Sequence, residues 1–207
     1  LFILMQSLDT NNGWSPTGYS RIAVFDLTND IWVDVDTVTA GIQAIELAGD
    51  NPYENFYYSE KRGKLYIATI GNRYDKSLSK IEEVDPITYQ VRSLVSAGDY
   101  SDTNICNDLI IDVAVFSDTI GAFIQYKSWG NNILSFFNPL TGEITDTDVL
   151  KSQSARKLKK LAYDSIGNLY VLEQTFGNDG ILKITPSKSI IGPINLYMPP
   201  NFMVIVE

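Results

Sequence analysis

The sequence predicts an all-β fold, a β-propeller of about four blades in which each blade is a sheet of four antiparallel strands. Three observations predict it: a strand pattern that recurs four times, turn residues at fixed places within that pattern, and no stretch of a dozen residues with apolar positions at helical spacing. We treat residues 1–207 as a single propeller or a part of one, with approximate repeat units 1–62, 63–118, 119–166 and 167–207. Since four blades is the low end of the natural range, we expect these units to belong to a larger ring.

One strand of each repeat has an aromatic residue second and a β-branched residue third. In the last three repeats a glycine comes shortly before this strand, which is typical of a turn that leads into a strand. The aromatic residues are 64, 57 and 47 residues apart, an irregular period near that of propeller blades. These strands are predicted at residues 1–4, 65–68, 122–125 and 169–172.

A second strand that ends in a tight turn follows in every repeat. Asp85-Pro86 and Asn138-Pro139 suit a type I turn, because Asp or Asn accepts a local backbone hydrogen bond and proline presets φ at the next position. The second strands are predicted at 21–26, 79–86, 132–139 and 181–186, third strands at 90–95 and 143–146, and innermost strands at 55–60, 109–116, 158–164 and 201–207.

A β-sandwich or barrel is the main competing fold, since either would also contain many short strands. Neither fold gives a reason to repeat the order of glycine, aromatic residue and Asx-Pro turn. The repeat therefore favours the propeller.

Composition excludes several classes of function. With 16 basic and 25 acidic residues the net charge is −9, which disfavours binding to nucleic acid. No histidine is present, so Ser-His-Asp catalysis and His-ligated zinc are excluded within this chain, and Cys106 alone forms no intrachain disulfide. The apolar run Leu1–Met5 is far shorter than the ~20 residues of a membrane span, so no membrane span is expected.

The chain resembles bacterial propellers with YVTN-type repeats and their surface-layer and lipoprotein relatives. The resemblance rests on Gly63-Lys64-Leu65-Tyr66-Ile67 followed by Val84-Asp85-Pro86-Ile87-Thr88, and on Gly167-Asn168-Leu169-Tyr170-Val171. It implies a bacterial cell-envelope or extracellular location, with the export signal outside this chain, and a role in binding or display. Related gluconolactonase-like propellers imply a metal-assisted hydrolysis of lactones as the alternative.

Aromatic residues occur in each loop that is expected to leave the blades on one common face. An aromatic ring beside carboxamide groups suits a sugar or a peptide. The leading hypothesis is therefore a binding or scaffolding propeller without catalytic residues, which presents this face to a glycan, peptide or protein partner. The candidate ligand-binding residues are Trp14, Tyr19, Tyr74, Trp129 and Phe176.

The enzymatic alternative needs a divalent ion held by carboxylate and carboxamide oxygens in the central channel. Oxygen-rich loops suit calcium, although no defined calcium-loop spacing is present. We expect no cofactor under the leading hypothesis and calcium under the alternative. The candidate metal ligands, all near the starts of innermost strands, are Glu54, Asn107, Asp108 and Asn201.

Overall fold

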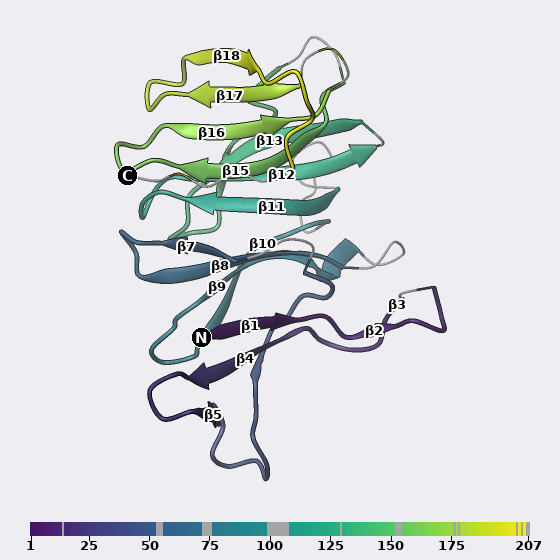
Figure 1. Ribbon diagram of the computed structural model, residues 1–207, viewed down its shortest axis with the longest axis vertical. Coiled ribbons are helices and arrows are strands. Elements are labelled where there is room, and N and C mark those ends of the chain that lie inside the picture. The colour runs from purple at the N-terminus through teal and green to yellow at the C-terminus, as the bar shows by residue number, and fades with distance from the viewer. Residues whose placement is uncertain are drawn as a thin grey trace. The chain divides into compact units, whose positions relative to one another are not determined.

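The computed structural model describes residues 1–13, 15–52, 56–71, 76–98, 108–128, 130–151, 155–175, 177, 179–201, 203 and 205 (Figure 1). The chain forms two compact units, an N-terminal unit of residues 1–107 and a C-terminal unit of residues 108–207. Each unit contains two antiparallel sheets, which we number 1 to 4 in chain order. No helix among the described residues is long and apolar enough to cross a membrane.

Sheet 1 lies in the N-terminal unit and has the strand order β1-β4-β5, with the short strand β6 paired to the other end of β4. Its core is apolar: Ile22, Val24 and Leu47 are buried, and Phe2 and Leu4 of β1 pack against them. A small hairpin of β2 and β3 interrupts the connection from β1 to β4. The bounds are β1 (Phe2–Met5), β2 (Leu8–Asp9), β3 (Ser15–Pro16), β4 (Arg21–Asp26), β5 (Ile31–Val33) and β6 (Ile45–Glu46).

Sheet 2 has the order β10-β9-β8-β7 and follows the predicted strands of the second repeat. Glu82 of β9 is fully buried, and its carboxylate accepts hydrogen bonds from the backbone N–H groups of Ala48 (2.7 Å) and Gly49 (3.0 Å). These bonds join the segment between β6 and β7 to sheet 2. The bounds are β7 (Tyr57–Ser59), β8 (Lys64–Ile70), the 3-10 helix η1 (Lys76–Leu78), β9 (Ser79–Val84) and β10 (Val91–Ser96).

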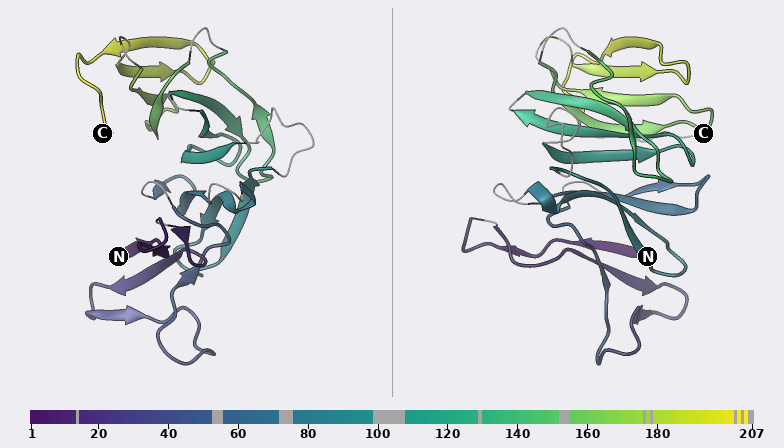
Figure 2. Two further views of the ribbon diagram at one scale, coloured as in Figure 1. Left: turned by 90° about the vertical axis from the view of Figure 1, so that its right-hand side faces the viewer. Right: turned by 180° about the vertical axis from the view of Figure 1, so that it is seen from behind.

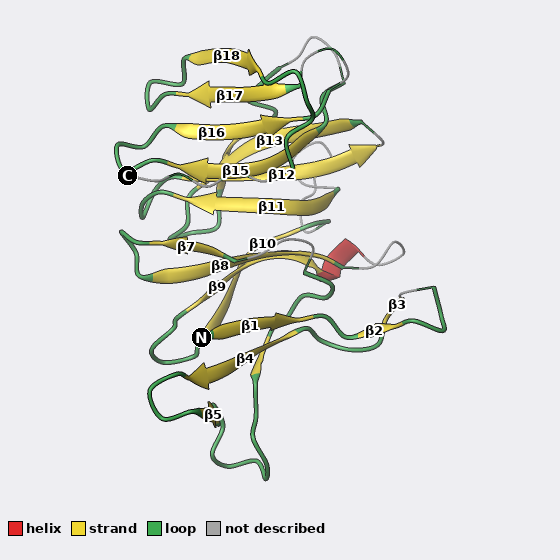
Figure 3. Ribbon diagram, viewed as in Figure 1, coloured by secondary structure: helices red, strands yellow, loops and turns green. Residues whose placement is uncertain are grey.

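The C-terminal unit repeats this plan twice, in sheet 3 (order β11-β12-β13-β14) and sheet 4 (order β15-β16-β17-β18). Figures 2 and 3 show that strands joined by short connections build both sheets. The bounds are β11 (Leu109–Val115), β12 (Gly121–Ser128), β13 (Asn131–Phe137), β14 (Ile144–Asp146), β15 (Leu158–Tyr163), β16 (Leu169–Glu173), β17 (Gly180–Ile184) and β18 (Ile190–Asn195).

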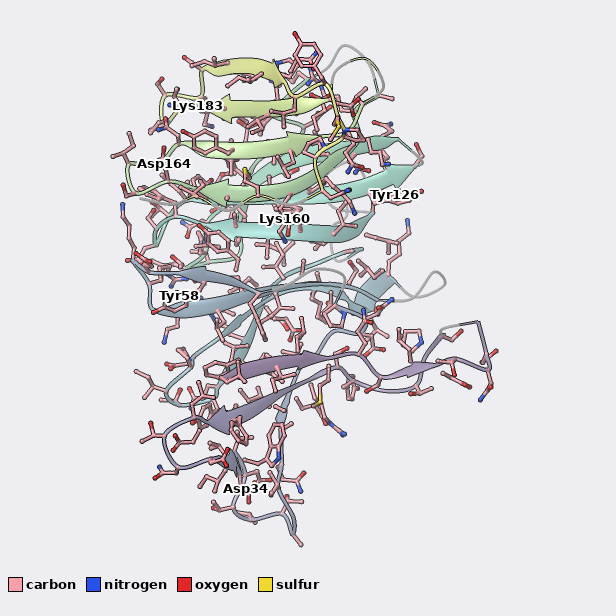
Figure 4. All side chains as sticks on the ribbon, viewed as in Figure 1. Asp34, Tyr58, Tyr126, Lys160, Asp164 and Lys183 are labelled. Carbon is pink, nitrogen blue, oxygen red and sulfur yellow. The ribbon has the colours of Figure 1, made fainter. Side chains whose placement is uncertain are left out.

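A buried carboxylate links the two sheets of the C-terminal unit. Asp112 of β11 is 2% exposed; its carboxylate accepts a hydrogen bond from the backbone N–H of Leu161 in β15 (2.7 Å) and forms an ion pair with the Nζ of Lys160 (2.9 Å). Lys160 is labelled in Figure 4. Because a buried charge is tolerated only when it is paired and hydrogen-bonded, Asp112 fixes how β15 lies against β11.

The predicted Asx turns are confirmed. The Oδ1 atom of Asp85 accepts hydrogen bonds from the backbone N–H groups of Ile87 (2.8 Å) and Thr88 (3.1 Å). Asn138 makes the same pair of bonds to Leu140 and Thr141 at the corresponding place in sheet 3. The all-β fold class and the four-stranded antiparallel sheets are confirmed as well.

Two features of the chain after β17 differ from the sequence prediction. The outer strand of the fourth repeat had been given no residue range; it is β18, and its Ile190, Ile191 and Ile194 are each about half exposed to solvent. The innermost strand expected over 201–207 is not seen at the residues described there, since Asn201 and the other two lie outside any strand. The carbonyl of Pro200 and the side chain of Asn201 instead accept hydrogen bonds from a glutamine side chain, described below.

Candidate functional site

The loop end of each sheet is the end at which the connections β1–β4, β8–β9, β12–β13 and β16–β17 lie. In sheet 4 this end is built around the buried Glu173, the last residue of β16. Its Oε2 atom accepts from the Nη1 of Arg156 (2.7 Å) and its Oε1 atom accepts from the hydroxyl of Thr175 (2.7 Å). The Thr175 oxygen in turn accepts from the backbone N–H of Lys157 (3.0 Å). With both carboxylate oxygens occupied, Glu173 orders the start of β15.

Asn132 brings the neighbouring sheet 3 into this group. Its backbone N–H donates to the carbonyl of Arg156 (2.7 Å) and its Nδ2 donates to the carbonyl of Leu158 (2.7 Å). Within the described part of the chain, the buried Oδ1 of Asn132 and the buried Nε of Arg156 have no protein hydrogen-bond partner. The cluster of Asn132, Arg156, Glu173 and Thr175 therefore joins two sheets at their loop ends.

In two different sheets, a glutamine side chain forms hydrogen bonds to an Asn-Pro or Pro-Asn segment; we call each of these contacts a clamp. After β1, the Nε2 of Gln6 donates to the Oδ1 of Asn51 (2.9 Å) and to the carbonyl of Pro52 (2.6 Å). After β16, the Nε2 of Gln174 donates to the Oδ1 of Asn201 (2.7 Å) and to the carbonyl of Pro200 (2.7 Å). Both glutamines come directly after the strand with the aromatic residue, and both hold an Asn and a proline carbonyl. The repeat thus extends to the loops, a relation that the sequence analysis missed.

The four candidate metal ligands are only partly described. Glu54 and Asn107 lie outside the described residues. Asp108 is partly buried directly before β11, and Asn201 is exposed with its amide oxygen bonded to Gln174. Among the residues that the structure describes, no group of three His, Cys, Asp or Glu side chains is arranged to hold a metal ion.

Of the five candidate aromatic residues, the structure describes Tyr19. It lies between the hairpin and β4 in the N-terminal unit, and its side chain is 51% exposed. The hydroxyl of Ser7, on the other side of the hairpin, donates to the Tyr19 carbonyl (3.3 Å). The other four candidates fall outside the described residues; they are Trp14, Tyr74, Trp129 and Phe176.

A row of charged side chains on sheet 2, centred on Glu83, was also not predicted from the sequence. The carboxylate of Glu83 contacts the guanidinium groups of Arg62 and Arg92 (the latter at 3.1 Å) and accepts from the hydroxyl of Tyr66 (2.6 Å). Burial, and then the adjacent Glu83, raises the pKa of the Tyr66 phenol far above its usual range, so it stays protonated and donates. The alternation in β8 and β9 puts Tyr66 and Glu83 on one sheet face, but only the register shows that they pair.

Comparison with solved structures decides the fold. A calcium-binding protein, regucalcin, from Agrobacterium tumefaciens superposes with a TM-score of 0.51 at 15% sequence identity, and covers 86% of this chain. A structure from a study of two prolyl endopeptidases gives a TM-score of 0.51 at 12% identity and covers 90% of this chain. The chain has a β-propeller fold.

The propeller likeness is structural and partial. This chain spans 57% of the regucalcin chain and 27% of the prolyl endopeptidase chain. No protein-family model matches the sequence, and no curated protein matches it. The likeness therefore gives the propeller fold and leaves ligand and activity to be argued from the residues.

Proposed function

We propose that this propeller is a binding platform without catalytic residues and that the loop end of sheet 1 binds a glycan, peptide or protein partner. One observation carries the proposal: the half-exposed ring of Tyr19 lies at the base of a hairpin whose described residues between β2 and β3 are all exposed. An aromatic ring that is apolar on its faces and polar at its hydroxyl suits recognition of a partly polar partner.

Hydrogen bonds at its base hold the hairpin in place. Thr17 donates from its backbone N–H (2.8 Å) and its hydroxyl (3.2 Å) to the carbonyl of Ser7, and Asp9 accepts from the backbone N–H of Asn11 (2.9 Å). A loop that is ordered before binding loses less conformational entropy when a partner docks. The hairpin therefore supports Tyr19 as a contact residue.

The clamps formed by Gln6 and Gln174 support the same proposal. Each fixes a proline carbonyl and an asparagine side chain, one clamp within each unit, so the same contact recurs in two separate sheets. Binding residues lie disproportionately on loops that a rigid scaffold positions. In this protein, the side chains of Gln6 and Gln174 provide such positioning next to the loops.

The test compares two tyrosines of nearly equal exposure. The protein is screened against a glycan array and a peptide library, and the best ligand is titrated against the Tyr19→Ala and Tyr58→Ala variants. Tyr58 is the matched control: it is 53% exposed and lies in β7, away from the loop end of sheet 2 (Figure 4). We expect Tyr19→Ala to weaken binding by about tenfold or more, as truncation of a contact aromatic does, and Tyr58→Ala to leave it unchanged. Equal effects of the two changes would reject the loop end as the binding surface.

A metal-dependent site is the alternative that the likeness to regucalcin favours, with Asp108 and Asn201 as the described oxygen ligands. A ligand that binds the folded state raises its melting temperature by mass action. We expect millimolar calcium to leave the melting temperature unchanged. A calcium-dependent rise that Asn201→Ala removes would favour the metal site over the platform.

A further inference from the structure

The hairpin of β2 and β3 carries the single Asn-Gly pair of the sequence, Asn12-Gly13. The pair lies between Asp9, the last residue of β2, and Ser15, the first residue of β3. Figure 1 shows that this hairpin extends beyond the end of sheet 1. Asn12 and Gly13 are both exposed. Water therefore has access to both residues.

An asparagine side chain that precedes a glycine can react with the backbone. The backbone nitrogen of the following residue attacks the side-chain carbonyl carbon, Cγ, and closes a five-membered imide ring. A Cβ atom on the following residue crowds this nitrogen, and glycine has none. The space beside Gly13 is open as well, since no atom beyond its chain neighbours lies within 4 Å of the place where a Cβ would be. The surroundings of Gly13 therefore do not hinder the attack on Asn12.

The turn at the tip of the hairpin leaves the two reacting groups without hydrogen bonds. The carbonyl of Asn12 accepts from the backbone N–H of Ser15 (3.2 Å), and the backbone N–H of Asn12 donates to the carbonyl of Asp9 (3.2 Å). Gly13 is the second residue of this turn and has a φ of 63°, a left-handed conformation that favours glycine. Within the described part of the chain, no hydrogen bond holds the side-chain amide of Asn12 or the N–H of Gly13. The Asn12 side chain can therefore rotate toward the Gly13 nitrogen.

Other asparagines in the described turns lack this combination. Asn51 and Asn138 precede prolines, whose nitrogen has no hydrogen to lose and cannot attack. Asn29 is exposed, but its Nδ2 donates to the Oδ2 of Asp26 (2.7 Å), which holds the side chain in place. Asn12 combines an exposed side chain, freedom from hydrogen bonds and a glycine as the next residue.

We propose that Asn12 is a site of spontaneous deamidation. The Gly13 nitrogen gives its proton to hydroxide and forms a bond to the Cγ of Asn12. The Cγ–Nδ2 bond breaks, and Nδ2 takes a proton from water and leaves as ammonia. Water then opens the imide: hydrolysis at Cγ gives aspartate, and hydrolysis at the backbone carbonyl carbon gives isoaspartate. Water is the net co-reactant, and no atom is oxidised or reduced.

Either product changes the surface of the hairpin. A carboxylate replaces a neutral amide, which adds one negative charge to a chain whose net charge is −9. In isoaspartate the main chain runs through Cβ and Cγ, so the turn is one carbon longer and the oxygen that accepted from Ser15 belongs to a free carboxylate. The described register of β2 and β3 contains two residue pairs, and so short a hairpin is marginally stable by itself. We therefore expect isoaspartate to loosen the hairpin.

Peptide mapping by mass spectrometry measures the reaction directly and needs no ligand, so its outcome is independent of the proposed function. The folded protein is incubated in neutral and in mildly alkaline buffer, and samples are digested with trypsin. Residues 1–20 contain no Lys or Arg, so Asn11 and Asn12 fall in one peptide that ends at Arg21, and fragment ions separate them. We expect Asn12 to react at least about tenfold faster than Asn11 or Asn29. Its rate should rise in the alkaline buffer, because the attacking nitrogen must lose a proton.

Two glycine variants test the attacking residue. Gly13→Ala adds a Cβ next to the nitrogen and should slow the modification of Asn12 by about tenfold or more. Gly18→Ala is the matched control, because the space around its Cβ is also open, and it should leave the rate at Asn12 unchanged. Far-UV circular dichroism shows that both variants keep the fold.

The unfolded protein in urea gives the rate of an unconstrained Asn-Gly pair. Because the folded hairpin leaves Asn12 and Gly13 open, we expect the folded rate to lie within about tenfold of the unfolded rate. The proposal is overturned if the folded rate is lower than that, if Asn11 or Asn29 reacts as fast as Asn12, or if Gly13→Ala leaves the rate unchanged.

Discussion

Asp112→Ala tests the link between the two sheets of the C-terminal unit. Asp112 is almost fully buried, and its carboxylate serves two donors of β15, the Nζ of Lys160 and the backbone N–H of Leu161. The alanine variant leaves both donors without this acceptor. Since the Lys160 side chain is only 14% exposed, water replaces the lost partner poorly.

The size of the effect follows from these two contacts. Removing one partner of a buried ion pair costs about 3–5 kcal/mol, and an unsatisfied buried N–H costs about 1–3 kcal/mol. The two costs overlap, because the end of Lys160 moves toward solvent once it is released. We therefore expect Asp112→Ala to lower the free energy of unfolding by about 3–5 kcal/mol.

Urea unfolding followed by far-UV circular dichroism measures this change. The control is Asp146→Ala, which breaks the exposed pair of Asp146 with Lys188 (3.0 Å, side chains 29% and 58% exposed) and should cost less than about 1 kcal/mol. The double variant Asp112→Ala/Lys160→Met lacks the unpaired ammonium group, so it should regain part of the free energy of unfolding that the single variant loses. A single variant within about 1 kcal/mol of the original protein, or a double variant no more stable than the single one, would refute the reasoning.

Two further predictions concern a turn and a packed glycine. The hydrogen bond from Lys64, and then those from two backbone N–H groups, hold the pKa of Asp85 well below its usual range, so its stabilisation is present above about pH 4 and is lost as the pH falls through the lowered value. Asp85→Asn should flatten the fall of melting temperature between neutral and acid pH, and an unchanged pH profile would argue against this role. In Gly121→Ala the new Cβ would lie 2.4 Å from the ring of the buried Phe137, which should cost about 1–3 kcal/mol in urea unfolding. Gly18→Ala, with open space around its Cβ, is the control and should leave the free energy of unfolding unchanged. An equal free energy of unfolding in the two variants would show that the Phe137 ring moves to make room for the new Cβ.

The strands were predictable because their signals are local. The alternation of Arg21–Asp26 gives β4 with its full bounds, and the acceptor role of Asp85 follows from a side chain that reaches only two or three residues ahead. The range of the outer strand β18 was harder to predict, because its Gly192 and Pro193 are residue types typical of turns. At a sheet edge a proline needs no ladder partner for its nitrogen, so the structure accepts it there.

The contacts between elements could not be predicted, because they join residues far apart in the chain. Glu82 is a charged residue in a strand, and nothing near it shows that the N–H groups of Ala48 and Gly49 will meet its carboxylate. The same holds for the clamp from Gln174 to Asn201, where the sequence suggested a metal ligand and the structure shows a hydrogen-bond acceptor. Of the predicted aromatic surface, the structure places Tyr19, and its role stays a prediction.

The half-exposed isoleucines of β18 have a practical consequence for work with the purified protein. From Ser189 to Val206 the sequence carries no charged side chain, so neither repulsion nor a hydration shell around charges keeps two such strands apart at high concentration. Pro193 lacks an N–H and therefore prevents strand pairing at one position, but the side chains of Ile190 and Ile191 are about half exposed to solvent. We expect copies of the protein to associate through this strand and to make concentrated stocks turbid. The substitution Ile191→Lys is the simplest way to delay this association.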